Sequence, residues 1–306
     1  MEQSVKTIYP RNGMPSAKRK RSTLRRYTPW LFLLPAMAIF LVYVIYPIID
    51  SIWLSFFEWD GLGEKTWVGL GNYVELFESE AFYTSLKNNF LWLIFFMIAP
   101  PAGLAIALFL NQQVKGIRVV KSLFFFPFVI SQVVVGLVFA WFYDPTFGLF
   151  NITLSSMGFE PIAILSDEDY VTYGIIAAGL WPQVSYCMIL YLTGLNNLDP
   201  EQIEAARLDG AKKWRMLWYV VLPQLRPATF IAIVVTVIGA LRSFDLVATM
   251  TAGGPWGSSS VLAYQMYEES IFNYRMGYGA SVSVVLFLIM DVYIAYFLWR
   301  MLRSEK

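Results

Sequence analysis

The chain of 306 residues is 57% hydrophobic and only 15% charged, with a formal net charge of +1. A water-soluble domain usually carries about 25% charged residues, and a globule of this length could not bury so much apolar surface. The composition therefore excludes a soluble globule, a disordered chain, a collagen-like repeat and a coiled coil. It predicts a membrane protein.

Two absences from the sequence exclude large classes of chemistry. The chain has no histidine, and its one cysteine is Cys187. Ser-His-Asp and Cys-His catalysis, histidine metal sites, internal disulfides and cysteine metal cages are therefore excluded. We expect no catalytic residue, no metal ligand and no cofactor bound by this chain. An intramembrane enzyme would have almost no side chains able to catalyse a reaction.

Six stretches are apolar enough to cross the hydrocarbon core of a bilayer, which takes about 20 helical residues. The sequence thus predicts an all-α, polytopic membrane protein, with a basic arm over residues 1–27 and a six-span domain over residues 28–306. The spans are expected at about 28–52, 88–112, 120–143, 171–196, 222–246 and 277–302. The segment Thr251–Ser260 is rich in glycine and serine, which is typical of turns.

The distribution of charge predicts the orientation. Lysine and arginine residues number 19 of 23 in the segments 1–27, 111–121, 196–227 and 300–306. The intervening loops on the other side are acidic instead. Because positive loops stay in the cytoplasm, both termini are expected there, in a bacterial cytoplasmic (inner) membrane. A basic segment beside a membrane helix indicates contact with anionic lipid.

Some polar and proline residues fall inside the predicted spans. Pro100 and Pro101 interrupt the second span and Pro182 the fourth, which predicts kinks. Such a kink serves either helix packing or a bend beside a transport pathway. Arg242 and Asp245 are three residues apart in the fifth span, which predicts a local ion pair on one helical face.

The loop over residues 199–221 carries strong local signals. Asp199 suits a helix N-cap and Pro200 the first helical position, so a short helix is expected to run to about Asp209. Gly210 permits a tight reversal, and a second helix is expected from Ala211. By composition alone this helix–turn–helix is either a surface-lying amphipathic element or a docking element for a cytoplasmic partner.

The same loop resembles the EAA loop of ABC importer permeases. That pattern reads Glu-Ala-Ala, three residues, Gly, nine residues and aliphatic-x-Leu-Pro. The matching residues are Glu204, Ala205, Ala206, Gly210 and Val220-Val221-Leu222-Pro223. Further stretches, such as Phe124–Pro127 and Met250–Pro255, resemble the carbohydrate branch of that family, the maltose-F or glycerol-phosphate-A type. The resemblance implies a type I importer permease (MetI-like) bundle with a cytoplasmic EAA coupling helix.

The resemblance also implies a function and a set of partners. The chain would be the permease subunit of an ATP-driven, binding-protein-dependent importer of a sugar or sugar derivative, and would form half of the pathway. Expected partners are a second permease subunit of similar fold, two copies of a cytoplasmic ATPase subunit, and a periplasmic or lipid-anchored solute-binding protein. No nucleic acid is expected.

ATP and Mg²⁺ would belong to the ATPase, so the chain itself would not be an enzyme. Glu204 would pair with a basic group of the ATPase, and Ala205, Ala206 and Gly210 would shape the contact.

The solute pathway follows from the same resemblance. In the maltose relative the sugar contacts come from the spans that correspond to the third, fourth and fifth here. The matching positions are Phe128, Gln132, Gly179, Gln183, Tyr186, Gly239 and Ser243. Their amides and hydroxyls can bond sugar hydroxyls, and Phe128 can stack on a sugar face. The alternative is that these polar residues only join membrane helices.

The alternative class of function is a secondary transporter without an ATPase partner. That class predicts internal repeats, interrupted helices and ion ligands near the middle of the membrane. The sequence shows no convincing inverted repeat, and the EAA-like loop would have no role.

Overall fold

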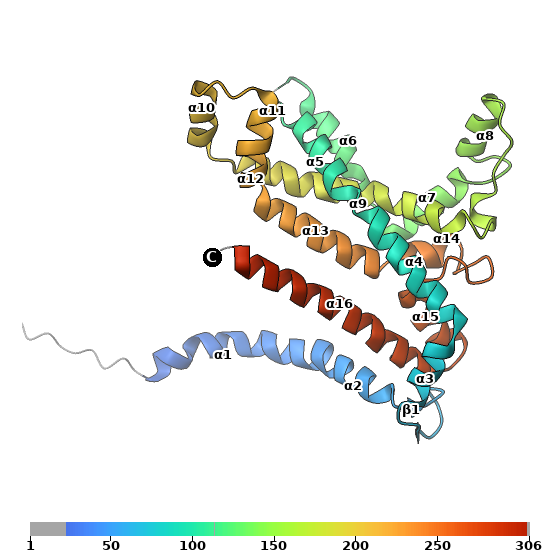
Figure 1. Ribbon diagram of the computed structural model, residues 1–306. Coiled ribbons are helices and arrows are strands. Elements are labelled where there is room, and N and C mark those ends of the chain that lie inside the picture. The colour runs from blue at the N-terminus through green and yellow to red at the C-terminus, as the bar shows by residue number, and fades with distance from the viewer. Residues whose placement is uncertain (1–22, 113, 305–306) are drawn as a thin grey trace, which may run out of the picture. The chain divides into compact units, whose positions relative to one another are not determined.

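The computed structural model describes residues 23–112 and 114–304, most of which are helical (Figure 1). The chain divides into two units, residues 1–50 and 51–306. Within the described residues the only strands are β1 (Phe57–Glu58) and β2 (Thr66–Trp67), which pair antiparallel. The all-α fold class is thus confirmed. The predicted arm over residues 1–27 lies mostly outside the described residues.

The described part of the first unit, residues 23–50, is helical. α1 (Thr23–Phe40) leads through a π-helical turn, η1 (Leu41–Ile45), into α2 (Tyr46–Leu54). Residues Trp30–Leu54 are long and apolar enough to cross a membrane. They cover most of the first span expected from the sequence, residues 28–52.

Three further helices are long and apolar enough to span. α4 (Glu80–Phe96) and α5 (Ala99–Leu110) form one candidate span, α9 (Val171–Asn196) a second and α16 (Met276–Ser304) a third. The bounds of α9 are those expected for the fourth span. α16 starts one residue before the expected sixth span and ends two residues after it.

The prolines in these helices act differently. Pro100 and Pro101 lie in the first turn of α5, just after the helix is interrupted at Met97 and Ile98. The first turn of a helix tolerates proline because its N–H groups have no intrahelical acceptor. Pro182 instead lies inside α9, which remains helical on both sides of it.

The third span, expected as one helix over 120–143, is broken. α6 (Ile117–Val129) and α7 (Gln132–Phe142) meet at an angle of 99°. Ile130 is extended, and Ser131 caps α7 by accepting a hydrogen bond from the Val134 N–H at 3.4 Å. A serine cap starts a new helix rather than continuing the old one, and this local effect overrides the continuous apolar pattern.

The fifth span, expected over 222–246, is also shorter than predicted. α11 (Lys213–Met216), η3 (Leu217–Val221) and α12 (Leu222–Gln224) form a helical segment that lies at 69° to α13 (Arg226–Leu241). The Ser243 hydroxyl donates to the Ala240 carbonyl at 2.8 Å, where the helix ends. If each bent pair is one span, the described residues contain six candidate spans by length and composition.

The end of α13 also removes the predicted ion pair. Arg242 lies in a linker, whereas Asp245 begins the separate helix α14 (Asp245–Met250). The two residues therefore do not share a helical face, and no salt bridge joins them in the described part of the chain. The expectation of a local pair was wrong because it assumed a continuous helix.

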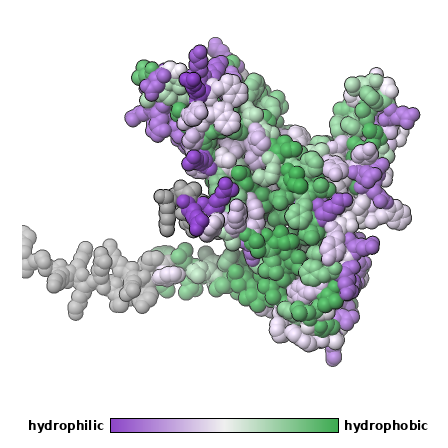
Figure 2. Space-filling view, viewed as in Figure 1, coloured by the Kyte–Doolittle hydropathy of each residue, from purple (hydrophilic) through white to green (hydrophobic). Residues whose placement is uncertain are grey.

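The remaining short elements lie between the spans. They are α3 (Gly71–Glu78), α8 (Leu149–Ser156), η2 (Ile164–Ser166), α10 (Pro200–Leu208), α15 (Leu262–Tyr267) and η4 (Glu268–Phe272). Hydrophilic side chains gather over α10 and α11, whereas apolar ones cover the middle of the long helices (Figure 2). This distribution is that of a protein with its middle in lipid and its ends in water.

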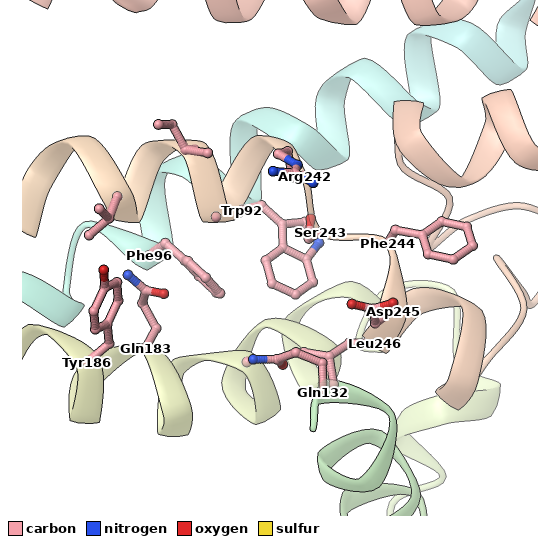
Figure 3. A pocket seen from close by; sticks show the side chains of 14 residues that line it. Trp92, Phe96, Gln132, Gln183, Tyr186, Arg242, Ser243, Phe244, Asp245 and Leu246 are labelled. Carbon is pink, nitrogen blue, oxygen red and sulfur yellow. The ribbon is translucent and has the colours of Figure 1, made fainter. Parts of the chain in front are cut away.

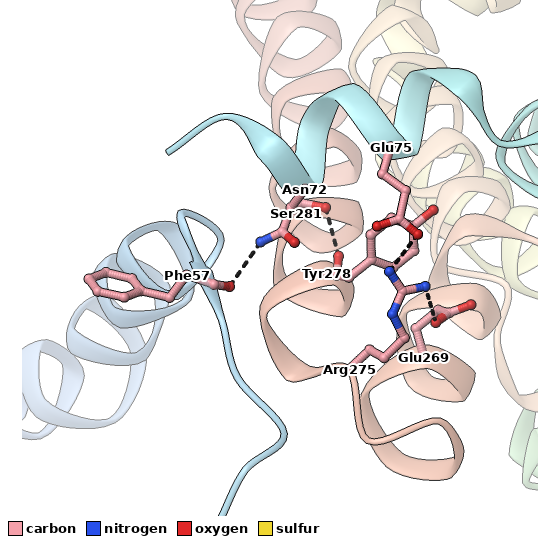
Figure 4. A network of polar contacts seen from close by, with 7 residues as sticks. All are labelled: Phe57, Asn72, Glu75, Glu269, Arg275, Tyr278 and Ser281. Carbon is pink, nitrogen blue, oxygen red and sulfur yellow. Dashed lines mark hydrogen bonds and ion pairs between the residues drawn. The ribbon is translucent and has the colours of Figure 1, made fainter. Parts of the chain in front are cut away.

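A polar network joins α3, η4 and the start of α16 (Figure 4). The Arg275 guanidinium bonds the carboxylates of Glu75 and Glu269, and Asn72 donates to the Phe57 carbonyl at 2.9 Å. In the nearby exposed loop, the backbone N–H groups of Gly63 and Leu62 lower the pKa of Asp60. These contacts give the acidic loop after α2 a defined shape.

Two neighbouring asparagines on α4 hold the turn segment expected over 251–260. The Asn88 amide donates to the carbonyls of Ser258 and Ser260 at 2.6 and 2.7 Å. The Asn89 side-chain amide oxygen, Oδ1, accepts a hydrogen bond from the Leu262 N–H at 2.9 Å. Both asparagines are buried. They therefore satisfy backbone groups of an irregular segment that its own turns leave free.

This network predicts that Asn88→Asp destabilises the fold. The substituted carboxylate has nearly the same shape but cannot donate to the two carbonyls of Ser258 and Ser260. Each unmade bond to a buried group costs about 1–3 kcal/mol, so the free energy of unfolding should fall by about 2–6 kcal/mol. Thermal unfolding in detergent measures this change. Asn111→Asp, at an exposed position, is the control and should unfold close to the parent.

Candidate functional site

A cavity of about 380 Å³ lies between α4, α7, α9, α13 and α14 (Figure 3). Six of the seven residues predicted for a solute pathway line it, namely Gln132, Gly179, Gln183, Tyr186, Gly239 and Ser243. Three of these six, Gly179, Gln183 and Tyr186, lie on one stripe of α9, because they are four and three residues apart. The structure thus brings together residues that are up to 111 positions apart in the chain.

The helix breaks place two of these residues at the cavity. Gln132 is the first residue of α7, just after the bend at Ser131. Ser243 lies in the linker between α13 and α14. Continuous helices, as expected from the sequence, would not turn at these two points. The breaks are therefore part of how the cavity is built.

Phe128, the seventh predicted residue, does not line the cavity. Its ring stacks on the Tyr186 ring with a centroid distance of 4.8 Å and an interplanar angle of 10°. Tyr186 does line the cavity, and the stacking contact with Phe128 helps to orient the Tyr186 ring. In this structure Phe128 is therefore linked to the cavity only through its contact with Tyr186.

The polar atoms around the cavity are only partly used by the protein. The Gln183 side-chain N–H donates to Thr236 Oγ1 at 2.9 Å, which orients its amide. Its Oε1 atom lies 3.5 Å from where a Cβ on Gly239 would be. The indole Nε1 of Trp92, which is 1% exposed, has no hydrogen-bond partner among the described residues. The amide oxygen of Gln183 is therefore the acceptor that the cavity offers, whereas the unpartnered Trp92 N–H is buried in its wall.

Several lining residues were not predicted from the sequence. They are Trp92, Phe96, Val235, Ile238, Arg242, Phe244, Asp245 and Leu246. Trp92 and Phe96 are one helical turn apart on α4, which is the second span, whereas the resemblance pointed only to the third, fourth and fifth. Figure 3 shows Arg242 and Asp245 on separate segments beside the same cavity. Their charges give the cavity one cationic and one anionic side chain.

Glycines control the width of the cavity. A Cβ on Gly179 would lie 3.0 Å from atoms of Leu246, Phe96 and Trp92. A Cβ on Gly239 would meet only Gln183, at 3.5 Å. Gly179 therefore lets α9 approach α4 and α14 closely, whereas Gly239 leaves space open.

The EAA-like loop forms the expected short helix. Asp199 caps α10 by accepting the Glu201 N–H at 3.0 Å. At the other end Gly210 has φ +77°, and the Ala211 N–H donates to the Ala206 carbonyl at 2.9 Å. This is the Schellman arrangement, which reverses the chain after a helix. The second helix begins at Lys213, two residues later than predicted, because the extended Lys212 precedes it.

The loop presents its predicted residues outward and is tied to the bundle at its base. Glu204 and Ala205 are exposed and Ala206 is half-buried. The Asp199 backbone N–H donates to Gln224 Oε1 at 2.9 Å, which joins the start of the loop to α12. The short helix is thus an exposed protrusion with a defined attachment.

No group of histidine, cysteine or acidic residues that could hold a metal ion occurs among the residues that the structure describes. The cavity has no nucleophile paired with a base. Its amides, hydroxyls and aromatic rings suit reversible binding of a polar solute.

Comparisons with known proteins agree on one family. A family model described as a binding-protein-dependent transport system inner membrane component matches residues 99–303. A probable ABC transporter permease protein of Pyrococcus horikoshii is 33% identical over 90% of this chain and 96% of its own length. The lactose transport system permease protein of Rhizobium radiobacter is 33% identical over 90% of this chain and 95% of its own length.

A solved structure shares the fold. It is a bacterial ABC transporter involved in the import of the acidic polysaccharide alginate, with a TM-score of 0.81 and 22% identity. The match covers 92% of this chain and 98% of that chain.

The two glycines at the cavity predict opposite responses to the same change. Gly179→Ala should lower the melting temperature, since its methyl group would meet three fixed side chains at 3.0 Å. Gly239→Ala should leave it unchanged or raise it, because alanine favours a helix by about 1 kcal/mol over glycine. Thermal unfolding of both variants in the same detergent measures this. Equal melting temperatures would contradict the packing described for α9.

Proposed function

The chain belongs to the family of binding-protein-dependent transport system inner membrane components, and from this premise we propose that it is the permease subunit of an ATP-driven carbohydrate importer. A cavity between candidate membrane spans, lined by amides, hydroxyls and aromatic rings, is the observation that carries the solute class. Sugars offer many hydroxyl groups and apolar ring faces, and these two kinds of lining side chain complement them. Membership of a binding-protein-dependent family leaves the secondary-transporter alternative without support.

The solute passes through the cavity between α9, α13 and α7 in this proposal. Gln132, Gln183 and Ser243 bond sugar hydroxyls, and Tyr186 stacks on a ring face with Phe128 behind it. Similarity to a lactose permease subunit supports a sugar, and similarity in fold to an alginate importer is consistent with it. Arg242 adds the capacity to hold an acidic substituent on that sugar.

Coupling to ATP hydrolysis takes place at α10. The exposed Glu204 pairs with a basic group of a cytoplasmic ATPase, which holds ATP and Mg²⁺, and the small Ala205 and Ala206 permit close contact. Support comes from the exposure of this helix and from its match to the EAA pattern. Two ATPase copies, a second permease and a periplasmic or lipid-anchored binding protein complete the complex. Both termini of this chain face the cytoplasm.

ATP hydrolysis by the complete complex tests this function. The four-subunit complex in lipid should hydrolyse ATP faster when a binding protein loaded with one sugar of a panel is added. Glu204→Lys should remove at least about nine-tenths of this stimulation, because the reversed charge repels the basic group that Glu204 meets. Membrane insertion of the variant should be normal.

Asp209→Lys is the matched control. It reverses the same charge five residues away, and a cation at a helix C-terminus is favourable. Full stimulation by the Glu204→Lys complex would exclude the proposed role of Glu204. Failure of the parent chain to associate with any ATPase would exclude the importer function as a whole.

Cysteine labelling tests the orientation. Since Cys187 is buried and is the only cysteine, a membrane-impermeant maleimide should report introduced cysteines alone. Ser155→Cys, in the loop after α7, should react in intact cells. Lys115→Cys, in the loop after α5, should react only after the cells are permeabilised. The reverse pattern would place the termini outside.

A further inference from the structure

The segment between α10 and the fifth span exposes three large aromatic side chains. Trp214 is 73% exposed, Trp218 60% and Tyr219 80%. They lie on α11 and η3, the helical turns that lead directly towards α13. Aromatic residues exposed to this extent are costly in water, and in membrane proteins Trp and Tyr concentrate where lipid headgroups begin.

The charge of this segment has a single sign. Lys212, Lys213 and Arg215 are exposed, and no acidic residue occurs between Gly210 and Arg226. None of the three cations has a salt-bridge partner in the described part of the chain. A partner for this surface must therefore bring negative charge as well as apolar groups.

The shape of the surface is a recess. Trp214, Arg215, Trp218 and Tyr219 surround a groove of about 320 Å³. The groove is held in place from the other side, where Val221 packs against the apolar cluster that contains Leu225 and Leu195. The turn η3 is π-helical, with the Leu222 N–H bonded to the Leu217 carbonyl. This wider turn leaves Trp218 and Tyr219 exposed together while Val220 and Val221 are half-buried.

We propose that this groove, lined by Trp214, Arg215, Trp218 and Tyr219, binds the headgroup of an anionic phospholipid of the cytoplasmic leaflet. Arg215 bonds the phosphate, the indole N–H and phenol groups bond headgroup oxygens, and Lys212 and Lys213 add attraction over a longer range. The apolar faces of the rings meet the first part of the acyl chains. The proposal rests on the cytoplasmic orientation proposed above and adds a ligand that the transported solute does not supply.

The charge complementarity decides for a lipid over a sugar or a neutral peptide. An apolar partner would gain nothing from three cations beside the rings. A free anion would gain nothing from three exposed aromatic side chains. A ligand with an anionic head and an apolar tail uses both halves of the groove. In the orientation proposed above, anionic lipid of the cytoplasmic leaflet lies at the same depth as this groove.

Native mass spectrometry of the full chain tests the proposal. The purified chain is titrated with phosphatidylglycerol or phosphatidylcholine of the same acyl length, and bound lipids are counted. The parent should retain phosphatidylglycerol preferentially. The triple variant Lys212→Gln, Lys213→Gln, Arg215→Gln should weaken this retention by about fivefold per cation removed. Trp214→Leu combined with Trp218→Leu should weaken retention of both lipids.

A second triple variant controls for net charge. Lys115→Gln, Arg118→Gln, Lys121→Gln removes three cations from the start of α6 and the turn before it, on the same side, and should leave the preference intact. Equal loss in both triple variants would overturn the site in favour of unspecific attraction. Unchanged lipid retention together with lost association with the ATPase would assign the groove to ATPase docking. The sugar-stimulated ATP hydrolysis of the parent complex reports on the transport function separately from either result.

Discussion

Two hydrogen-bonding asparagines, Asn88 and Asn89, are the constraint on which the rest of the bundle depends. The segment from Thr251 to Val261 is irregular, and its last residues, Ser259 to Val261, are buried among packed helices. Non-helical backbone is tolerated in such a place only if its polar groups are satisfied by protein or by a water-filled cavity. The side chains on α4 satisfy them, and α15 can then begin directly afterwards at Leu262.

The same constraint positions the cavity. Trp92 and Phe96 follow Asn88 at intervals of four residues on α4, so they share its face. That face packs with Leu246 of α14 in one apolar cluster. Once α4 is joined to the irregular segment, the direction of Trp92 towards Gly179 is determined. A contact in the middle of α4 thus sets the wall of a cavity one turn away.

Much of this arrangement could be predicted from the sequence. Long apolar stretches predict spans well because the thickness of the bilayer fixes their length, and for α9 even the bounds agreed. The shared face of Gly179, Gln183 and Tyr186 could be predicted, because their spacing of four and three residues matches the helical period of 3.6. The Schellman turn at Gly210 is also a local signal, and the structure has it.

The breaks were missed because Ser131 and Ser243 act through single hydrogen bonds, to which hydropathy is insensitive. Trp92 was missed because a buried tryptophan looks like core until the structure shows the cavity beside it.

The two helices that flank the EAA-like loop, α9 and α13, each contribute three residues to the lining of the cavity. α9 ends at Asn196, three residues before Asp199. The Asp199 N–H donates a hydrogen bond to Gln224 Oε1, two residues before α13 begins. Leu225 packs so closely on α9 that a Cβ on Gly194 would lie 2.8 Å from its Cδ2 atom. A force applied to α10 is therefore transmitted first to the adjoining ends of α9 and α13. Because both helices are continuous from there to Gln183 and Gly239, the proposed coupling needs no relay through the rest of the bundle. The bend at Ser131 has the opposite effect, since it separates α7 and Gln132 from α6, the other half of their span. One wall of the cavity can then move relative to the other, which is what alternating exposure of a solute site requires.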